Sequence, residues 1–237
     1  MEEIAAQIPA GARLVDVGTD HGHLPIWLLL QGRITRAIAT DVREGPLSRA
    51  RENAARYGCA LELRLGDGLA PVRPEECDTI AIAGMGGETI AAILTAAPWT
   101  AEGHHLLLLQ PMTMAAELRQ FLYANGYEIL RETVCREEQH WYVVLTVRGG
   151  AAAQTLPLGA CCLSPALLQA PGAPAYLAHL LKRARRALDG LHQARQADET
   201  RLATQELAVR TLQQAVQTLQ GQAAAQPNHI EQEDSLL

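Results

Sequence analysis

The feature of this sequence that most constrains its fold is an alternation of short apolar runs and helical segments over residues 1–150. Five runs have the length and composition of buried strands, and helical spacing of apolar residues follows four of them. The predicted strands are residues 13–17, 37–41, 61–65, 78–83 and 105–110, and the predicted helices are residues 24–31, 45–57, 88–96 and 114–125. This alternation predicts an α/β fold around a parallel sheet.

Two further strand-like runs, residues 127–135 and 140–148, are joined by only a few charged residues. So short a link requires an antiparallel hairpin, because a parallel crossover needs about a dozen residues or more. A parallel sheet that ends in such a hairpin resembles the sheet of Rossmann-like class I methyltransferases, whereas dehydrogenases usually keep their sheet parallel. We therefore expect residues 1–150 to form one methyltransferase-like domain.

The rest of the chain has a different pattern. Residues 149–174 are rich in Gly, Ala and Pro and are predicted to be a connector, and apolar residues then recur at coiled-coil spacing up to residue 219. We predict a helical coiled-coil domain over residues 151–222, in which the polar residues 193–200 form the turn of an antiparallel hairpin. One long helix that pairs with a second chain is the alternative. Residues 223–237 are polar and are predicted to be a disordered tail.

The charge pattern bears on possible partners. The net charge of -6 argues against a nucleic-acid partner, but residues 151–237 carry equal numbers of basic and acidic side chains. A phosphate backbone responds to the local charge within a Debye length of about 8 Å. The local basic cluster consists of Lys182, Arg183, Arg185 and Arg186, for which a solvated helix face is the alternative interpretation.

The cysteines and the apolar runs indicate a cellular compartment. The five cysteines form no CxxC pair and are odd in number, which argues against a disulfide framework and a zinc ribbon. No group of His, Asp and Glu has metal-ligand spacing, so no metal is expected. No leader-like segment and no apolar run of about 20 residues is present, so we expect a cytoplasmic protein that does not span a membrane.

The first predicted strand runs into a loop with the sequence Asp16-Val17-Gly18-Thr19-Asp20-His21-Gly22. Gly18 and Gly22 allow a ligand to approach the backbone where a strand meets a helix, which is where open α/β sheets bind ligands. Two carboxylates here would repel a pyrophosphate, but they suit the ammonium and sulfonium of S-adenosylmethionine. The loop therefore favours this methyl donor over NAD, with Asp16, Gly18 and Thr19 around it.

The ends of the next two strands carry further carboxylates. Asp41 can accept both ribose hydroxyls of the donor, with Val42 beside it, and a helix-capping role is the alternative. Asp67, followed by Gly68, can accept the adenine amino group of the donor, and a simple turn aspartate is the alternative.

A glycine-rich segment, Gly84-Met85-Gly86-Gly87, follows the fourth strand, where the transferred methyl group should point. We expect Gly84 and Met85 to contact the donor and Gly86 and Gly87 to leave room for a flat base. The segment lacks the Asn or Asp with prolines that many amino-methylating enzymes use to hold an exocyclic amine. A ring nitrogen needs less of such help. Gln110 and Pro111 end the fifth strand beside this segment, where Gln110 is predicted to read a base edge or to be the polar end of a buried strand.

Two residues of the first loop are the catalytic candidates. Methylation of N1 of adenine creates a cation, so the Asp20 carboxylate could stabilise that charge or help to remove the amino proton. His21 is predicted to face the same cleft, and a hydrogen bond within the loop is its alternative role.

Together these segments resemble the TrmK family of bacterial tRNA (adenine-22-N1)-methyltransferases. The motifs that carry the resemblance are residues 15–25 (VDVGTDHGHLP), 83–87 (AGMGG) and 109–111 (LQP). The resemblance covers residues 4–150 closely. It implies a Rossmann-like methyltransferase domain, a C-terminal coiled coil, S-adenosylmethionine as donor and tRNA as substrate. The usual Asn after Gln-Pro is Met112 in this chain.

Other classes of function stay open on the sequence alone. The acidic net charge favours a methyltransferase that acts on a small molecule, and a non-catalytic RNA-binding protein with the same fold is a third possibility. We expect a monomer, with a dimer through the coiled coil as the alternative.

Overall fold

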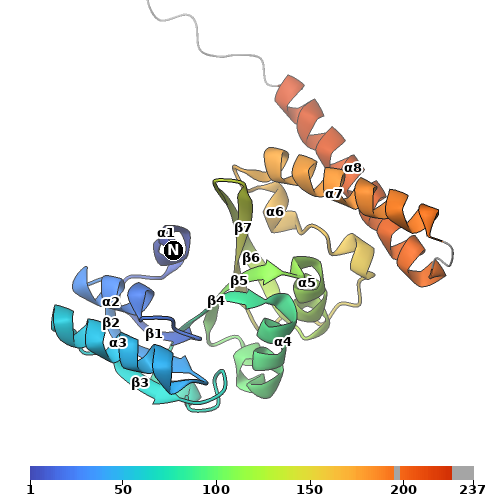
Figure 1. Cartoon of the computed structure of the whole chain (residues 1–237). Coiled ribbons are helices and arrows are strands. Elements are labelled where there is room, and N and C mark those ends of the chain that lie inside the picture. The colour runs from blue at the N-terminus through green and yellow to red at the C-terminus, as the bar shows by residue number, and fades with distance from the viewer. Residues whose placement is uncertain (195–197, 226–237) are drawn as a thin grey trace, which may run out of the picture.

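The computed structural model describes residues 1–194 and 198–225, and one seven-stranded mixed sheet forms its centre (Figure 1). The sheet order is β3-β2-β1-β4-β5-β7-β6, in which β1 to β5 run parallel and β7 pairs antiparallel with both β5 and β6. The strands are β1 (Ala12–Val17), β2 (Ile34–Asp41), β3 (Glu62–Leu65), β4 (Thr79–Gly86), β5 (Leu106–Thr113), β6 (Glu128–Glu137) and β7 (His140–Arg148). The predicted α/β class, with its terminal hairpin, is therefore confirmed.

Helices cover both faces of the sheet. On one face, α4 (Gly87–Ala96) and α5 (Ala115–Ala124) pack on the central strands through buried residues such as Ile90 and Leu118. On the other face, α1 (Glu2–Gln7) and α2 (His23–Leu30) bury Ile4 and Leu28 against the sheet, and α3 (Glu44–Tyr57) lies beside α2. The paired parts of the central strands β4 and β5 are almost wholly apolar because helices bury both faces of the sheet there.

The connection between β3 and β4 contains only a short 3-10 helix, η1 (Pro74–Glu76), in place of a crossover helix. An ionic cluster ties this connection to the edge of the sheet. Arg64 of β3 donates to the carboxylate of Glu76 at 2.8 Å and to the carbonyl oxygen of Pro71 at 2.7 Å. Arg64 thereby holds the pKa of Glu76 well below its ordinary value. The loop that follows β3 is fixed from both of its ends.

The central strands continue further than the sequence predicted. Strand β4 extends to Gly86 and β5 to Thr113, whereas the predicted ends were residues 83 and 110. The pairing continues past Pro111 through register shifts on both sides of Met85. Proline is tolerated at such an irregularity because the regular ladder does not need its missing N–H there.

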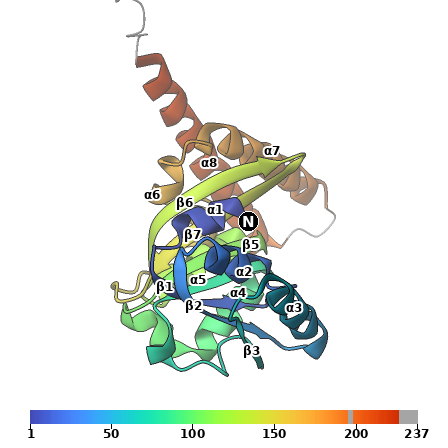
Figure 2. The same cartoon turned by 90° about the vertical axis from the view of Figure 1, so that its left-hand side faces the viewer.

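The C-terminal part contains η3 (Leu158–Ala160), α6 (Pro165–Leu168), α7 (Ala173–Gln193) and α8 (Glu199–Ala225). Helices α7 and α8 lie side by side and antiparallel (Figures 1 and 2), since Arg185 contacts Gln213 and His192 contacts Glu206. Residues 195–197 of the predicted turn and 226–237 of the predicted tail lie outside the described residues. Supercoiling of the pair stays a prediction.

A buried ionic network joins this C-terminal part to the sheet. Arg119 of α5 and Glu132 of β6 form a two-bonded ion pair at 2.9 and 2.8 Å, with side chains that are 1% and 0% exposed. Ser164 donates to Glu132 at 2.5 Å, and Arg119 donates to the carbonyl oxygen of Cys161 at 3.3 Å. The connector after β7 is therefore bound to the methyltransferase-like part by charged hydrogen bonds.

The five cysteines are all free thiols, as the sequence suggested. Burial raises the pKa of Cys77 to about 12 and that of Cys162 to about 11, so both stay protonated at neutral pH. Across residues 1–194 and 198–225, no helix combines the length and apolar character that a membrane crossing requires.

Candidate active site at the strand ends

The loop after β1 is held tightly against the end of β2. The backbone N–H groups of Gly18 and Thr19 donate to the carbonyl oxygen of Thr40 at 2.8 and 3.0 Å. Gly18 has a φ of +72°, and the methyl group of Met85 occupies the space that a Cβ at position 18 would need. Only glycine satisfies both conditions, so this turn brings β1 and the end of β4 into direct contact.

Two polar side chains in this turn are buried without a full set of partners. The Asp16 side chain is 8% exposed, and burial raises its pKa to about 6. The Thr19 hydroxyl is buried and makes no hydrogen bond of good geometry to any described residue. A buried carboxylate and an orphaned hydroxyl are expected where a polar ligand completes the site.

Asp41 lies at the carboxyl end of β2 and is 8% exposed. One of its carboxylate oxygens, Oδ1, accepts the backbone N–H of Arg43 at 2.8 Å, which starts the turn into α3. No described residue donates to Oδ2. Asp41 therefore does not cap α3, whose N-cap residue is Arg43 and has no side-chain cap, but forms a turn just before the helix and leaves an acceptor for a ligand. The neighbouring Val42 is 60% exposed, as expected for an apolar surface that a ligand would cover.

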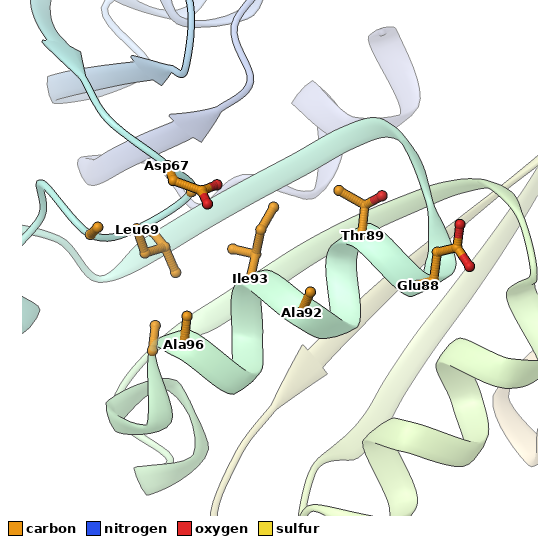
Figure 3. Close-up of a pocket in the computed structure, with 10 residues that line it drawn as sticks. Asp67, Leu69, Glu88, Thr89, Ala92, Ile93 and Ala96 are labelled. Atoms are coloured by element: carbon orange, nitrogen blue, oxygen red, sulfur yellow. The ribbon is translucent and has the colours of Figure 1, made fainter.

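The loop that carries Asp67 and Gly68 is fixed to the end of β2. The Thr40 hydroxyl donates to the carbonyl oxygen of Gly68 at 2.9 Å. The N–H of Gly66 donates to the carbonyl oxygen of Asp41 at 3.0 Å. A cavity of about 450 Å³ lies between this loop and α4 (Figure 3). Asp67 and Leu69 border it on one side, and Thr89 and Ile93 face them from α4. Of the predicted donor residues, Asp67 and Gly68 line this cavity, whereas Asp16 and Asp41 do not.

The glycine-rich end of β4 lies next to the end of β5. The amide oxygen of Gln110 accepts the N–H of Gly84 at 2.9 Å, and its amide nitrogen lies 3.3 Å from the carbonyl oxygen of Pro111. Gln110 is buried, so in this structure it positions Gly84, which has a φ of +75°. A side chain at Gly87 would meet the backbone carbonyl of Met114, so there is no room for one at this position.

The two catalytic candidates lie on the outer side of the first loop. A carboxylate oxygen of Asp20 lies 3.3 Å from His21 Nε2 and 3.8 Å from Arg49 of α3, and the Asp20 side chain is 72% exposed. His21 has a positive φ of 64°, and its carbonyl oxygen accepts a hydrogen bond from Asn53. No sequence pattern pointed to Arg49 or Asn53, because α3 meets the loop only in the folded chain.

His23, to which the sequence assigned no role, also belongs to this group. Its ring stacks on that of His21 with centroids 5.3 Å apart. The spacing of two residues between His21 and His23 was the only feature of the sequence that could have indicated this contact.

The basic cluster does not join the strand-end residues. It lies on α7, where all four cations are exposed and Arg185 donates to Gln213 of α8. The predicted site thus divides into a group at the strand ends and a separate surface on the helical part.

Known proteins resemble this chain in both sequence and structure. A family model described as a methyltransferase domain matches residues 1–145. The tRNA (adenine(22)-N(1))-methyltransferase of Bacillus subtilis is 36% identical over 152 residues, an alignment that covers 63% of this chain and 64% of the relative. The alignment thus spans slightly less than two thirds of that relative.

Solved structures extend the likeness to nearly the whole chain. A Streptococcus pneumoniae protein, described as a candidate tRNA (m1A22) methyltransferase, is 30% identical with a TM-score of 0.79, covering 91% of this chain and 97% of that one. The same protein in complex with S-adenosyl-L-methionine aligns with a TM-score of 0.75 at 28% identity, with the same coverage.

The sheet order, the glycine turn after β1 and the matching family model define a methyltransferase of the Rossmann-like class. Within that class, the chain belongs to the TrmK family of bacterial tRNA (adenine-22-N1)-methyltransferases.

Proposed function

We propose that this chain transfers a methyl group from S-adenosylmethionine to N1 of an adenine in bacterial tRNA, adenine 22 by family resemblance. The observation that carries the proposal is that the turn after β1, with the buried carboxyl of Asp16, lies directly against the glycine-rich end of β4, where Met85 contacts Gly18. The turn after β1 would hold a cationic donor, and the end of β4 would give a flat base access to it.

The strand-end residues fit this donor. Asp16 offers a carboxylate to an ammonium, Thr19 a hydroxyl without a partner, and Asp41 a carboxylate oxygen to the ribose. Asp67, exposed at the mouth of the cavity, offers an acceptor to the adenine amino group. Gly18, Val42, Gly68, Gly84 and Met85 complete the proposed donor site.

The rim of the site supports a ring nitrogen as the acceptor. When bound, S-adenosylmethionine supplies an electrophilic methyl group, which the N1 lone pair can attack without prior removal of a proton. Gly86, Gly87 and Pro111 offer no side-chain donor that would hold an exocyclic amine. Gln110 contributes by fixing Gly84 through its amide oxygen.

Asp20 is proposed to act on the positive charge that methylation leaves on the base. Its exposed carboxylate lies within 4 Å of His21 Nε2 and of the Arg49 guanidinium. It can stabilise the methylated ring or receive the amino proton. His21 is proposed to orient this carboxylate.

The wider proposals follow from the same assignment. Residues 1–150 would bind the donor and 151–222 would form a helical domain that contacts tRNA through Lys182, Arg183, Arg185 and Arg186, with 223–237 as a tail. We propose a cytoplasmic monomer that uses no metal, with a dimer through the helices as the alternative. Residues 1–194 and 198–225 contain no group of three or more His, Cys, Asp or Glu side chains suited to a metal ion.

The proposal is tested with labelled methyl donor and unmodified tRNA transcripts that carry either adenine or guanine at position 22. We expect label on the first transcript alone, and a stop of reverse transcription at that position, because N1-methylation blocks base pairing. Label on small molecules only would favour a small-molecule methyltransferase. Binding of tRNA without transfer would favour a non-catalytic RNA-binding protein.

The role of Asp20 is tested with Asp20→Ala in the same assay. We expect unchanged affinity for the donor and a loss of roughly 100-fold or more in kcat, the usual contribution of a positioned acid or base. Asp20→Asn separates charge from shape. Equal losses in donor affinity and in turnover would contradict a catalytic role.

A further inference from the structure

The β6–β7 hairpin extends beyond the sheet at the edge where the candidate active site lies. Strand β7 pairs with β5 only from Leu106↔Arg148 to Leu109↔Leu145. Residues 140–144 therefore continue past the paired part of β5, in the direction of its carboxyl end. Figure 2 shows the hairpin arching away from the sheet to reach α7. The hairpin end and the rim of β4 thus share one edge of the molecule.

Aromatic contacts fix the hairpin end to α7. The Trp141 ring of β7 lies 5.6 Å from that of Tyr176 and 6.1 Å from that of His179, both on α7. The guanidinium of Arg136 lies 5.5 Å from the Trp141 ring centroid, a cation–π contact. The tryptophan thereby holds a hairpin arginine next to the helix.

Three cations from two segments converge at this contact. Lys182 and Arg183 lie three and four residues after His179 on α7, so the three side chains share one face of the helix. Arg136 and His179 both contact the Trp141 ring, and burial together with the three cations lowers the pKa of His179. All three cations are exposed, and none forms an ion pair within residues 1–194 and 198–225. Arg136 donates instead to the backbone carbonyl of Glu138 at 3.2 Å. Exposed charges of one sign that form no ion pair with a described residue favour a polyanionic partner.

We infer that Arg136, Lys182 and Arg183, assembled around Trp141 and His179, form a binding surface for the phosphate backbone of the substrate RNA. We name these five residues the hairpin–helix surface. It rests on the proposed function, because it holds the RNA whose adenine enters the strand-end site. It extends the basic cluster on α7 by adding Arg136 of the hairpin.

The test compares two double variants that remove equal charge. Arg136→Gln/Arg183→Gln alters the surface, whereas Arg131→Gln/Arg148→Gln removes two exposed, unpaired arginines toward the opposite end of the same hairpin. Affinity for a fluorescent full-length tRNA transcript is measured by anisotropy over a range of KCl concentrations. Donor affinity is measured by calorimetry, and methylation is measured at varied tRNA concentration.

We expect the surface variant to bind tRNA roughly tenfold more weakly at about 0.1 M salt and to lower the log–log salt slope by about 1.5, as the loss of two phosphate contacts requires. Its KM for tRNA should rise more than its kcat falls, with unchanged donor affinity. The control variant should match the wild type. Glu137→Gln, which removes an acidic neighbour in the hairpin, should strengthen binding.

Equal weakening by both double variants, or an unchanged salt slope for the surface variant, would overturn the inference. Methylation by the wild-type chain is measured in the same experiment, so a failure of the proposed function can be distinguished from a failure of the surface. No methyl transfer by the wild type would overturn that function, and the affinities would still decide the surface.

Discussion

At the scale of single residues, Asp16 links donor binding to pH. Its folded pKa of about 6 lies above the ordinary value of 3.8 because the carboxyl is buried. A cationic donor needs the ionised form, so its affinity should fall as the pH drops below about 6, by up to tenfold per pH unit. Calorimetry between pH 5 and 8 measures this, with Asp16→Asn as a control that binds weakly at every pH. A wild-type affinity that stays constant over this range would contradict the assignment.

Asp16 also lowers the free energy of unfolding at neutral pH. Because its folded pKa is raised, Asp16 favours the folded chain below pH 3.8, and this advantage is lost as the pH rises through about 6. Asp16→Asn should therefore raise the free energy of unfolding at pH 7 by up to about 3 kcal/mol. Denaturant titration at pH 7 and pH 5 would show a gain that shrinks at the lower pH.

Asp41 is expected to account for a large part of donor affinity. Asp41→Ala removes an ionised acceptor for ribose hydroxyls, and hydrogen bonds to charged groups contribute about 1.5–3 kcal/mol each. We expect donor affinity to fall by roughly 30-fold or more. Thermal unfolding is the control, since Arg43 loses its acceptor as well. Undiminished affinity would mean that Asp41 only starts the turn into α3.

At the scale of elements, the buried pair of Arg119 and Glu132 joins α5, β6 and the connector. Arg119→Met leaves Glu132 buried without its cation and should lower the free energy of unfolding by about 3–5 kcal/mol. The double variant Arg119→Met/Glu132→Leu removes both charges and should recover much of that loss. Urea unfolding of the wild type, the two single variants Arg119→Met and Glu132→Leu, and the double variant measures the four free energies of unfolding. Additive losses would show that the two residues do not interact.

The elements also show how far sequence reasoning reaches. The alternation of strands and helices and the hairpin could be predicted, because periodicity and short links are local properties of the chain. The extension of β4 past Gly84 could not, because the glycines there suggested a loop, and only pairing with β5 keeps the segment extended. Glu132, on a polar stretch of strand, showed no sign of burial, since its partners come from residues 119 and 164.

The candidate site was predictable in its donor half and less so beyond it. Asp16 and Asp41 follow apolar runs directly, so the strand ends bring them to one edge of the sheet. Arg49 beside Asp20, and Arg136 beside α7, are contacts between segments far apart in the chain. No local pattern encodes them.

At the scale of the whole molecule, the methyltransferase-like part depends on the connector that follows it. In a chain that ends at residue 150, Glu132 would lose Ser164, Arg119 would lose the carbonyl of Cys161, and Trp141 would lose its cover from α7. We expect this fragment to be less stable than the full chain by about 3 kcal/mol or more. Thermal unfolding with light scattering measures it, and an equally stable fragment would show that residues 1–150 fold independently.

The position of β7 inside the sheet has a consequence for synthesis on the ribosome. The last strand to be made fills the place between β5 and β6, so β5 keeps an unpaired edge while residues 114–139 emerge. Every residue of the proposed donor site, from Asp16 to Met85, has by then left the ribosome. Such an edge can pair with other chains. A nascent chain that already holds its donor site is therefore still open to aggregation, and this exposure ends only when residues 145–148 have paired with β5.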